Sequence, residues 1–400
     1  MKQGRKSFRR RFGTWGLMGL LWLGGCWLTG CAGPVSALPA ESERILPEEA
    51  FAPTEEIVLE TIGEEPETEA ETAEGPGEEQ IQVRTEQDGM IHSYLTGELV
   101  PVSQGCRRPL AIMMSNDKES LPQYGINRAG VVYEAPVEAT MNRYLAILED
   151  YDDLDRIGSV RSCRTYYIYF AREFDAIYAH FGQSTFAKPY LKAIDNINGI
   201  DGTGGAAYYR SKDKRSPHNA YASFDGIQRV IGRLGYSQEY DPEYQGHFRF
   251  TAPGTQVTLT GADAREAYKV SPGYRLNQPW FSYNEDDGLY YRFQYGGPHM
   301  GSEGQIAVKN LIIQYCSGGY YATTDYRNIN VHEPSWGYFI TGGRMEDITW
   351  EKDGEYGVTH YYDASGREIV LNPGKTWICI IPTNDMQPMS VEAKDGTPVL

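Results

Sequence analysis

The sequence predicts an α+β protein, with a mixed, layered α/β domain over residues 106–250 followed by a mostly antiparallel β domain over residues 251–385. In the first region, apolar runs of strand length alternate with stretches of helical spacing. In the second region, short alternating runs are separated by turn signals such as Asp286-Asp287-Gly288 and Asn372-Pro373-Gly374. About 310 residues are ample for a sizeable core and favour two domains.

The predicted elements follow from these patterns in chain order. In the first region, short apolar runs predict strands over 110–114, 131–133, 144–148 and 175–182. Helical spacing predicts helices over 165–174, 186–197 and 224–234, the last of which ends at Gly235. In the second region, the predicted strands are 257–259, 280–283, 289–293, 308–315, 337–341, 348–350, 359–362 and 376–381.

Residues 1–31 have the features of a secretory signal. They begin with a basic stretch, and an apolar run of about fourteen residues follows, which is short of the roughly 20 that span a bilayer. The segment Leu28-Thr29-Gly30-Cys31 resembles the bacterial lipobox, so we expect lipidation of Cys31 and attachment to the outer face of the cell membrane. The alternatives are lipidation of Cys26 and an uncleaved N-terminal anchor.

Residues 32–88 read as an acidic, disordered linker. Residues 41–88 hold seventeen acids and two bases, a net charge of −15, and a segment so charged cannot bury enough apolar surface to fold. The whole chain carries −17 and residues 1–40 carry +6, so residues 89–400 carry −8. This balance argues against nucleic-acid binding, which requires a broad basic field.

The segment Val160-Arg161-Ser162-Cys163-Arg164 carries the first candidate site. It places two arginines three residues apart, just before a predicted helix, where both guanidinium groups and the free backbone N–H groups can face one anion. The alternative is a pair of surface or ion-paired arginines. His180 ends a predicted strand, a position where α/β folds build sites, although a lone histidine there is more often a satisfied core or edge residue.

Two further candidates involve acid–base groups. The basic loop 210–219 closes on His218-Asn219, which could hold an anion and supply a proton donor or acceptor. Glu134 and Glu138 lie four apart around a proline, so in extended chain they would share a face as a carboxylate pair. The alternative reading is ion pairing with Arg143.

Common enzyme signatures are absent from the sequence. It contains no Walker loop, no GxSxG, no HExxH and no GxGxxG between a strand and a helix. The four cysteines of the predicted folded part have no metal-type spacing, and we predict no structural metal and no cofactor. Their disulfide pairing is left open; they are Cys106, Cys163, Cys316 and Cys379.

Several of these segments resemble the YerB-like bacterial lipoproteins, the domain-of-unknown-function 3048 family. Their first domain is matched by Arg108-Pro109-Leu110-Ala111-Ile112-Met113, Gly130-Val131-Val132-Tyr133-Glu134, Arg156-Ile157-Gly158-Ser159-Val160-Arg161-Ser162, Asp175-Ala176-Ile177-Tyr178-Ala179-His180 and Ser216-Pro217-His218-Asn219. Their second domain is matched by Thr341-Gly342-Gly343, Ile348-Thr349-Trp350 and Leu371-Asn372-Pro373-Gly374-Lys375-Thr376-Trp377.

The resemblance implies a two-domain envelope lipoprotein, mainly of Gram-positive type, and no particular reaction. The positions that match its motifs are Glu134, Arg161, Arg164, His180, His218 and Asn219. Cys163 stands where the family typically has a small apolar residue, which argues against a catalytic thiol.

The leading hypothesis is a lipid-anchored protein whose first domain binds an anionic wall polymer or peptide fragment. Arg161 and Arg164 would clamp the anion, while His180, His218 and Asn219 orient it and Glu134 positions the bases. The first alternative is a cell-wall hydrolase in which a histidine is the general base and the arginines stabilise an oxyanion. The second is a protein–protein interaction lipoprotein acting through the tyrosine-rich β domain.

Overall fold

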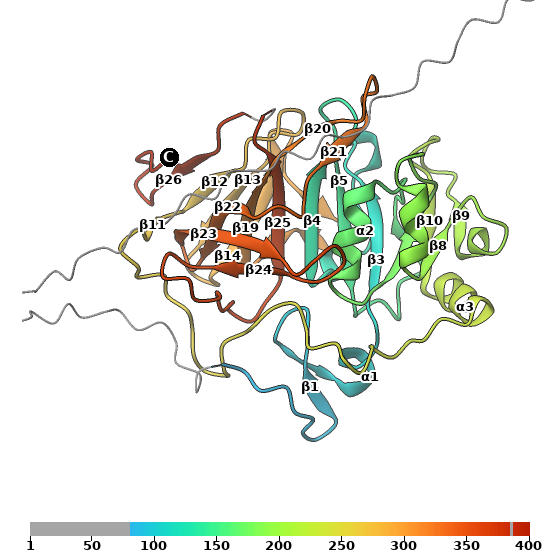
Figure 1. Cartoon of the computed structure of the whole chain (residues 1–400), viewed down its shortest axis with the longest axis horizontal. Coiled ribbons are helices and arrows are strands. Elements are labelled where there is room, and N and C mark those ends of the chain that lie inside the picture. The colour runs from blue at the N-terminus through green and yellow to red at the C-terminus, as the bar shows by residue number, and fades with distance from the viewer. Residues whose placement is uncertain (1–80, 385–386) are drawn as a thin grey trace, which may run out of the picture. The chain divides into compact units, whose positions relative to one another are not determined.

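The computed structural model describes residues 81–384 and 387–400. Strands predominate, so the protein is mostly β, and they form several sheets around one large mixed sheet (Figure 1). The α-helices of the described residues are α1 (Val102–Gly105), α2 (Thr165–Arg172) and α3 (Phe224–Leu234). Four 3₁₀ turns accompany them: η2 (Lys118–Ser120), η3 (Ile126–Arg128), η4 (Lys188–Ala193) and η5 (Gly204–Ala207). The expected signal, Cys31 and residues 32–80 of the expected linker lie outside the described residues.

The central sheet has eleven strands and combines parallel and antiparallel neighbours. Its order is β11 (Arg265–Glu266), β23 (Arg344–Lys352), β22 (Ser335–Thr341), β19 (Asn310–Cys316), β25 (Thr376–Pro382), β4 (Val131–Pro136), β5 (Asn142–Leu148), β3 (Leu110–Ser115), β7 (Ile177–His180) and β8 (Asn196–Asn198), with β24 (Thr359–Tyr362) paired to β23.

Strand β25 joins the two regions that the sequence distinguishes. It runs parallel to β19 on one side and parallel to β4 on the other, with Trp377 opposite Val132. Every residue of β25, β4, β5 and β3 is buried, which explains why their sequences are nearly continuous apolar runs rather than alternating ones. The two sequence regions therefore share one sheet, and residues 81–400 belong to a single compact unit.

The core lies on both faces of this sheet. On one face α2 packs through aromatic residues, and Phe170 stacks on Tyr133 of β4 at 4.3 Å between ring centroids. On the other face, Val230 of α3 and Phe281 of a second sheet belong to one apolar cluster with the central strands. Figure 1 shows α2 in front of the central strands.

The second sheet has six strands, all of which come from residues after 268. Its order is β15 (Gly297–Pro298), β14 (Leu289–Gln294), β13 (Trp280–Asn284), β12 (Lys269–Ser271) and β26 (Ser390–Glu392), with β18 (Ala307–Val308) paired to β14. A three-stranded sheet lies in the first region, in the order β6 (Ile157–Gly158), β10 (Ala220–Ala222) and β9 (Tyr208–Arg210). Three hairpins complete the fold: β1 (Met90–His92) with β2 (Leu99–Pro101), β16 (Met300–Gly301) with β17 (Gly304–Gln305), and β20 (Gly318–Tyr320) with β21 (Arg327–Ile329).

Helix α3 has the bounds that its sequence predicts. The side chain of Ser223 accepts a hydrogen bond from the N–H of Gly226, which satisfies a donor of the first turn. Gly235 closes the helix at φ 70°, a left-handed conformation that favours glycine. Local signals at both ends therefore determine this helix.

Three expectations are corrected by the structure. Residues 186–197 form the 3₁₀ turn η4 and strand β8 instead of an α-helix, because Asn196–Asn198 pairs with β7 and extends the central sheet. Residues 257–259 form no strand, since the backbone of Val257 bonds to the side chain of Asn372. The end of the expected linker is attached to the body, where Arg84 donates to the carbonyl oxygens of His92 and Gly105.

Candidate functional site

Glu134, one of the predicted site residues, lies in a buried polar network between the two sheets. Its carboxylate is 2.7 Å from the guanidinium group of Arg292 on β14, and both side chains are fully buried. The same carboxylate accepts hydrogen bonds from Asn142, Asn277 and Trp377, at 2.9 to 3.2 Å. Glu134 is thus satisfied internally and links the first region to the second, rather than facing a ligand.

The network continues through His299, which lies 2.6 Å from Arg292 and 2.8 Å from Gln123. Burial, reinforced by the charge of Arg292, lowers the pKa of His299 well below its usual range, so this imidazole stays neutral. Nothing in the sequence linked Glu134 to Arg292, which lies 158 residues further along the chain.

The predicted arginines lie in a second cluster near the N-terminus of α2. We call Arg143, Arg161 and Arg164, with Glu138 and Asp117, the arginine cluster. Glu138 pairs with Arg164 and, at 3.4 Å, with Arg143, so it does not form the expected carboxylate pair with Glu134. Arg161 is 3.9 Å from Asp117 and donates to the carbonyl oxygen of Pro217 at 3.2 Å.

Three guanidinium groups therefore surround two carboxylates, which leaves one positive charge uncompensated within the cluster. Burial and, as the second largest cause, repulsion from the charge of Arg164 lower the pKa of Arg143 to about 10. Although burial acts to raise it, the ion pairs with Arg164 and Arg143 lower the pKa of Glu138. Burial also lowers the pKa of Arg161. Excess positive charge at a partly dehydrated site favours binding of an anion.

His218 reaches the same cluster from the basic loop. Its Nδ1 atom is 3.4 Å from Asp117, whose carboxylate also accepts from the hydroxyl of Ser115 at 2.6 Å. The side chains of Arg161, Asp117 and His218 are 16–20% exposed, so this edge of the cluster is reachable from solvent. Both Arg161 Nε and His218 Nδ1 are buried atoms without a hydrogen-bond partner in the described part of the chain.

The remaining two predicted residues have structural partners. Asn219 accepts a hydrogen bond from Arg210 at 2.7 Å and donates to the carbonyl oxygen of Ser211, so it closes the loop between β9 and β10. His180 is fully buried, with its ring nitrogens at 2.8 Å from Gly182 O and 3.3 Å from Asn196 Oδ1. Burial lowers the pKa of His180, and it lies in the core rather than at the exposed edge of the cluster.

The structure thus brings together Arg161, Arg164 and His218, and it gives separate partners to Glu134, His180 and Asn219. Asp117 was not weighed as a site residue in the sequence. The signal was present, because Asn116-Asp117 directly follows the buried strand β3, at a position where polar loops often build sites.

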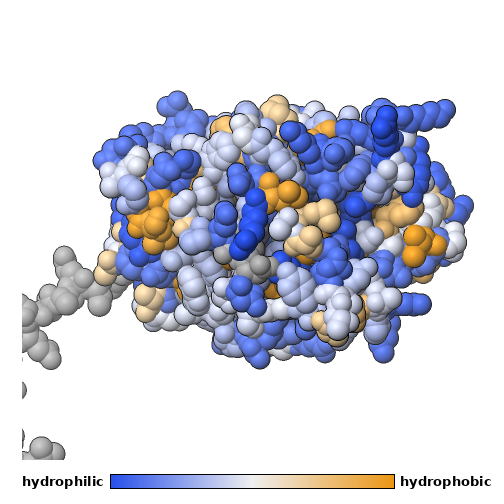
Figure 2. All heavy atoms as spheres, turned by 90° about the horizontal axis from the view of Figure 1, so that it is seen from above, coloured by the Kyte–Doolittle hydropathy of each residue, from blue (hydrophilic) through white to orange (hydrophobic). Residues whose placement is uncertain are grey.

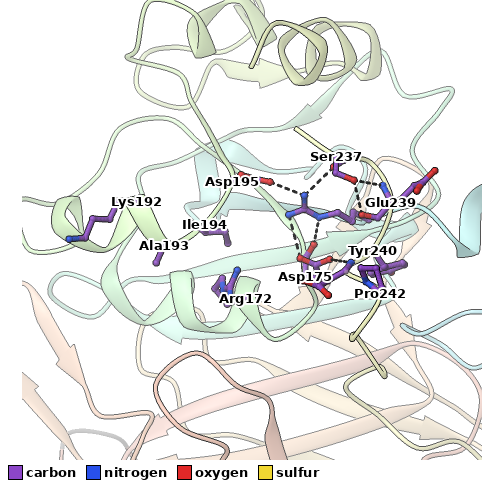
Figure 3. A pocket seen from close by; sticks show the side chains of 12 residues that line it. Arg172, Asp175, Lys192, Ala193, Ile194, Asp195, Ser237, Glu239, Tyr240 and Pro242 are labelled. Carbon is purple, nitrogen blue, oxygen red and sulfur yellow. Dashed lines mark hydrogen bonds and ion pairs between the residues drawn. The ribbon is translucent and has the colours of Figure 1, made fainter. Parts of the chain in front are cut away.

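Two cavities lie elsewhere. One of 440 Å³ is bordered by α2, η4 and residues 237–242 (Figure 3). In this cavity the Arg108 guanidinium donates hydrogen bonds to the carboxylate of Asp195, at 2.8 Å, and to the backbone carbonyl oxygens of Asp175 and Ser237. The other, of 560 Å³, lies between η3, the second sheet and residues 373–377, and we call it the inter-sheet cavity. Sequence reasoning identified neither.

Other features of the described residues bear on the alternatives. Cys106, Cys163, Cys316 and Cys379 are free thiols, and no group of three potential metal ligands was found in residues 81–384 and 387–400. Within the same ranges, none of the helices is long and apolar enough to span a bilayer. Hydrophilic side chains cover most of the face shown in Figure 2, with apolar ones in small separate groups.

Comparisons with known proteins place these features in a family. Residues 95–237 match the N-terminal domain of a protein family of unknown function, DUF3048, and residues 270–378 match its C-terminal domain. The chain is 28% identical to a provisionally named lipoprotein, YerB of Bacillus subtilis (strain 168), over 299 residues, which are 72% of this chain and 85% of that protein.

A crystal structure of Bacillus subtilis YerB has a similar fold. It superposes with a TM-score of 0.63 at 27% identity, covering 74% of this chain and 99% of that chain. The two matched domains, in the same order as the two sequence regions, together with the shared fold, show that this chain belongs to the DUF3048 family of YerB-like proteins.

Proposed function

We propose that this protein is a lipid-anchored, extracytoplasmic protein of the cell envelope that binds an anionic wall-derived ligand through the arginine cluster. The observation that carries this proposal is the imbalance of charge there. Within the described part of the chain, the carboxylates that pair with Arg143, Arg161 and Arg164 are those of Glu138 and Asp117, at an edge that solvent can reach. A phosphate or carboxylate group would supply the missing negative charge.

The exposed edge sets the roles of the individual residues. Arg164 and Arg143 are held by Glu138, so they supply a fixed positive field rather than flexible contacts. The Arg161 side chain is partly exposed and would bind the anion directly. His218, which lies beside the same carboxylate oxygen of Asp117 as Arg161, would donate a second hydrogen bond.

The anchor rests on the sequence and on the family. Residues 1–31 carry the signal features and the lipobox-like segment ending at Cys31. The related YerB is provisionally named a lipoprotein, which supports the same attachment here. Cell fractionation with a Cys31→Ala variant tests this part, because loss of the lipid should move the protein from the membrane fraction to the medium.

A binding experiment tests the ligand site. Purified cell walls, intact or stripped of their phosphodiester polymers, are incubated with the full chain, and the retained fraction is measured. We expect Arg161→Gln to reduce retention on intact walls several-fold, because a charge-assisted hydrogen bond is lost. Arg233→Gln, at an exposed position on α3, is the matched control and should leave retention unchanged. Equal retention of both variants would refute the proposal.

The hydrolase alternative has less support from the geometry. A general base must come within about 3 Å of a substrate atom or be linked to it by one water. His180 and Glu134 are fully buried and bonded to neighbouring groups, so His218 is the candidate that retains access. Release of soluble fragments from the same wall preparations would favour this alternative.

One observation favours the interaction alternative. Trp336 on β22 is 45% exposed, and it stacks on Tyr315 at 3.9 Å and packs edge-on against Tyr338 at 5.6 Å. Exposed aromatic groups of this kind are common at protein interfaces. A Trp336→Ala variant that loses a co-purifying envelope protein, while wall retention stays intact, would support it.

A further inference from the structure

We propose that the inter-sheet cavity binds a small amphipathic anion, namely a carboxylate or a phosphate monoester with a short apolar group. Its volume of 560 Å³ lies within the range of small-molecule sites. None of its lining residues belongs to the arginine cluster, so this proposal is independent of the wall-binding one.

The inner wall of the cavity is apolar and comes from both sequence regions. Val132 on β4 and Trp377 on β25 lie side by side in the central sheet and are 3% and 0% exposed. Ile306 and Val308, next to and within β18, face them from the second sheet and are each 4% exposed. Such a wall favours an apolar group of a ligand over water.

Two lysine residues line the same cavity. Lys375 donates from Nζ to the carbonyl oxygen of Asn127, and burial lowers the pKa of its side chain. Lys309 is on the adjacent segment, and its backbone N–H bonds to the carbonyl oxygen of Lys375 at 2.9 Å. Among the described residues, neither lysine forms an ion pair with a carboxylate. Glu98 and Glu303 attract the Lys375 ammonium without contacting it, so an anion bound in the cavity would be the first acidic group in contact with this charge.

The acidic residues of the cavity lie at its exposed rim. The carboxylate of Glu303 accepts a hydrogen bond from Arg128 at 2.8 Å, and that of Asp287 accepts a hydrogen bond from the hydroxyl of Tyr291 at 2.7 Å. Both are exposed, as is Glu98, whereas the two lysines are half-buried. The half-buried charged residues of the lining, Arg128, Lys309 and Lys375, are therefore all basic and lie next to an apolar wall, and this combination favours an amphipathic anion.

The test uses hexyl phosphate and hexanoate, titrated calorimetrically into the full chain. Saturable binding of either one supports the proposal, and the stronger of the two identifies the head group. Hexylammonium and inorganic phosphate are the comparison compounds and should bind at least about tenfold more weakly. Failure of both anions to bind, or equal binding of the comparison compounds, would overturn the proposal.

Variants locate the bound compound. Lys375→Met and Lys309→Met should each weaken binding about tenfold or more, since each removes a charge-assisted hydrogen bond. Val308→Phe should block binding by filling the cavity, because Val308 faces it. Lys188→Met, at an exposed position of η4, is the matched control and should bind normally.

Circular-dichroism melting tests whether each variant is folded. Only the affinities of folded variants are compared with that of the unmodified protein. Arg161→Gln should bind hexyl phosphate normally, which separates this site from the arginine cluster. Unchanged affinity in the folded cavity variants would refute the assignment.

Discussion

The pair of Glu134 and Arg292 gives the most demanding test of how this fold is held together. Arg292→Met removes the cation and leaves a buried carboxylate without its counter-charge. Breaking a buried pair in this way costs about 3–5 kcal/mol of unfolding free energy. Glu134 would keep its hydrogen bonds from Asn142, Asn277 and Trp377, so we expect a loss near the lower value, about 3 kcal/mol.

The assay is urea unfolding followed by circular dichroism. The double variant Glu134→Gln/Arg292→Met removes both charges and should be more stable than Arg292→Met alone, because no isolated charge is left buried. Arg367→Met is the matched control: its pair with Asp363 is at the surface, and its loss should cost less than about 1 kcal/mol. The reasoning is refuted if Arg292→Met costs no more than this control.

Three further predictions concern stability and reactivity. The charge of Lys352, acting against burial, holds the pKa of Glu173 at about 2, below the usual 4.5, so its contribution to stability is present above pH 4.5 and lost as the pH falls toward 2. Glu173→Gln should therefore flatten the acid side of a plot of urea midpoint against pH, and an unchanged slope would contradict this. Burial raises the pKa of Cys163 to about 12, so mass spectrometry after iodoacetamide treatment at pH 8 should show labelling of the half-buried Cys106 long before Cys163. Ser223→Ala should lower the unfolding free energy by about 1 kcal/mol in urea titrations, whereas Ser223→Asp should preserve it.

The candidate site was partly predictable because some of its contacts are local. Glu138 and Arg143 are five residues apart, and their ion pair was one of the two readings of that segment. Arg161 and Arg164 were identified from their spacing before a helix, and the structure places both in the arginine cluster. His180 could not be assigned in the same way, since a strand-end histidine looks alike in sequence whether it faces solvent or, as here, the core.

The inter-sheet cavity was not predictable from local patterns. Lys309 lies in the predicted strand over 308–315, and Lys375 follows the turn signal Asn372-Pro373-Gly374; neither was a candidate site residue. The cavity exists because residues 373–377 meet η3 and β18, which come from distant parts of the chain.

The sequence by itself determined the elements whose signals are local. Helix α3 is specified by its cap, its apolar face and Gly235, and the buried strands by continuous apolar runs. Only the tertiary structure decided how these strands are combined. The pairing of β25 with β4, the ion pair of Glu134 with Arg292 and the conversion of residues 196–198 into β8 all depend on partners far along the chain. A single sequence encodes which residues avoid water, but not which of many apolar or charged partners each will meet.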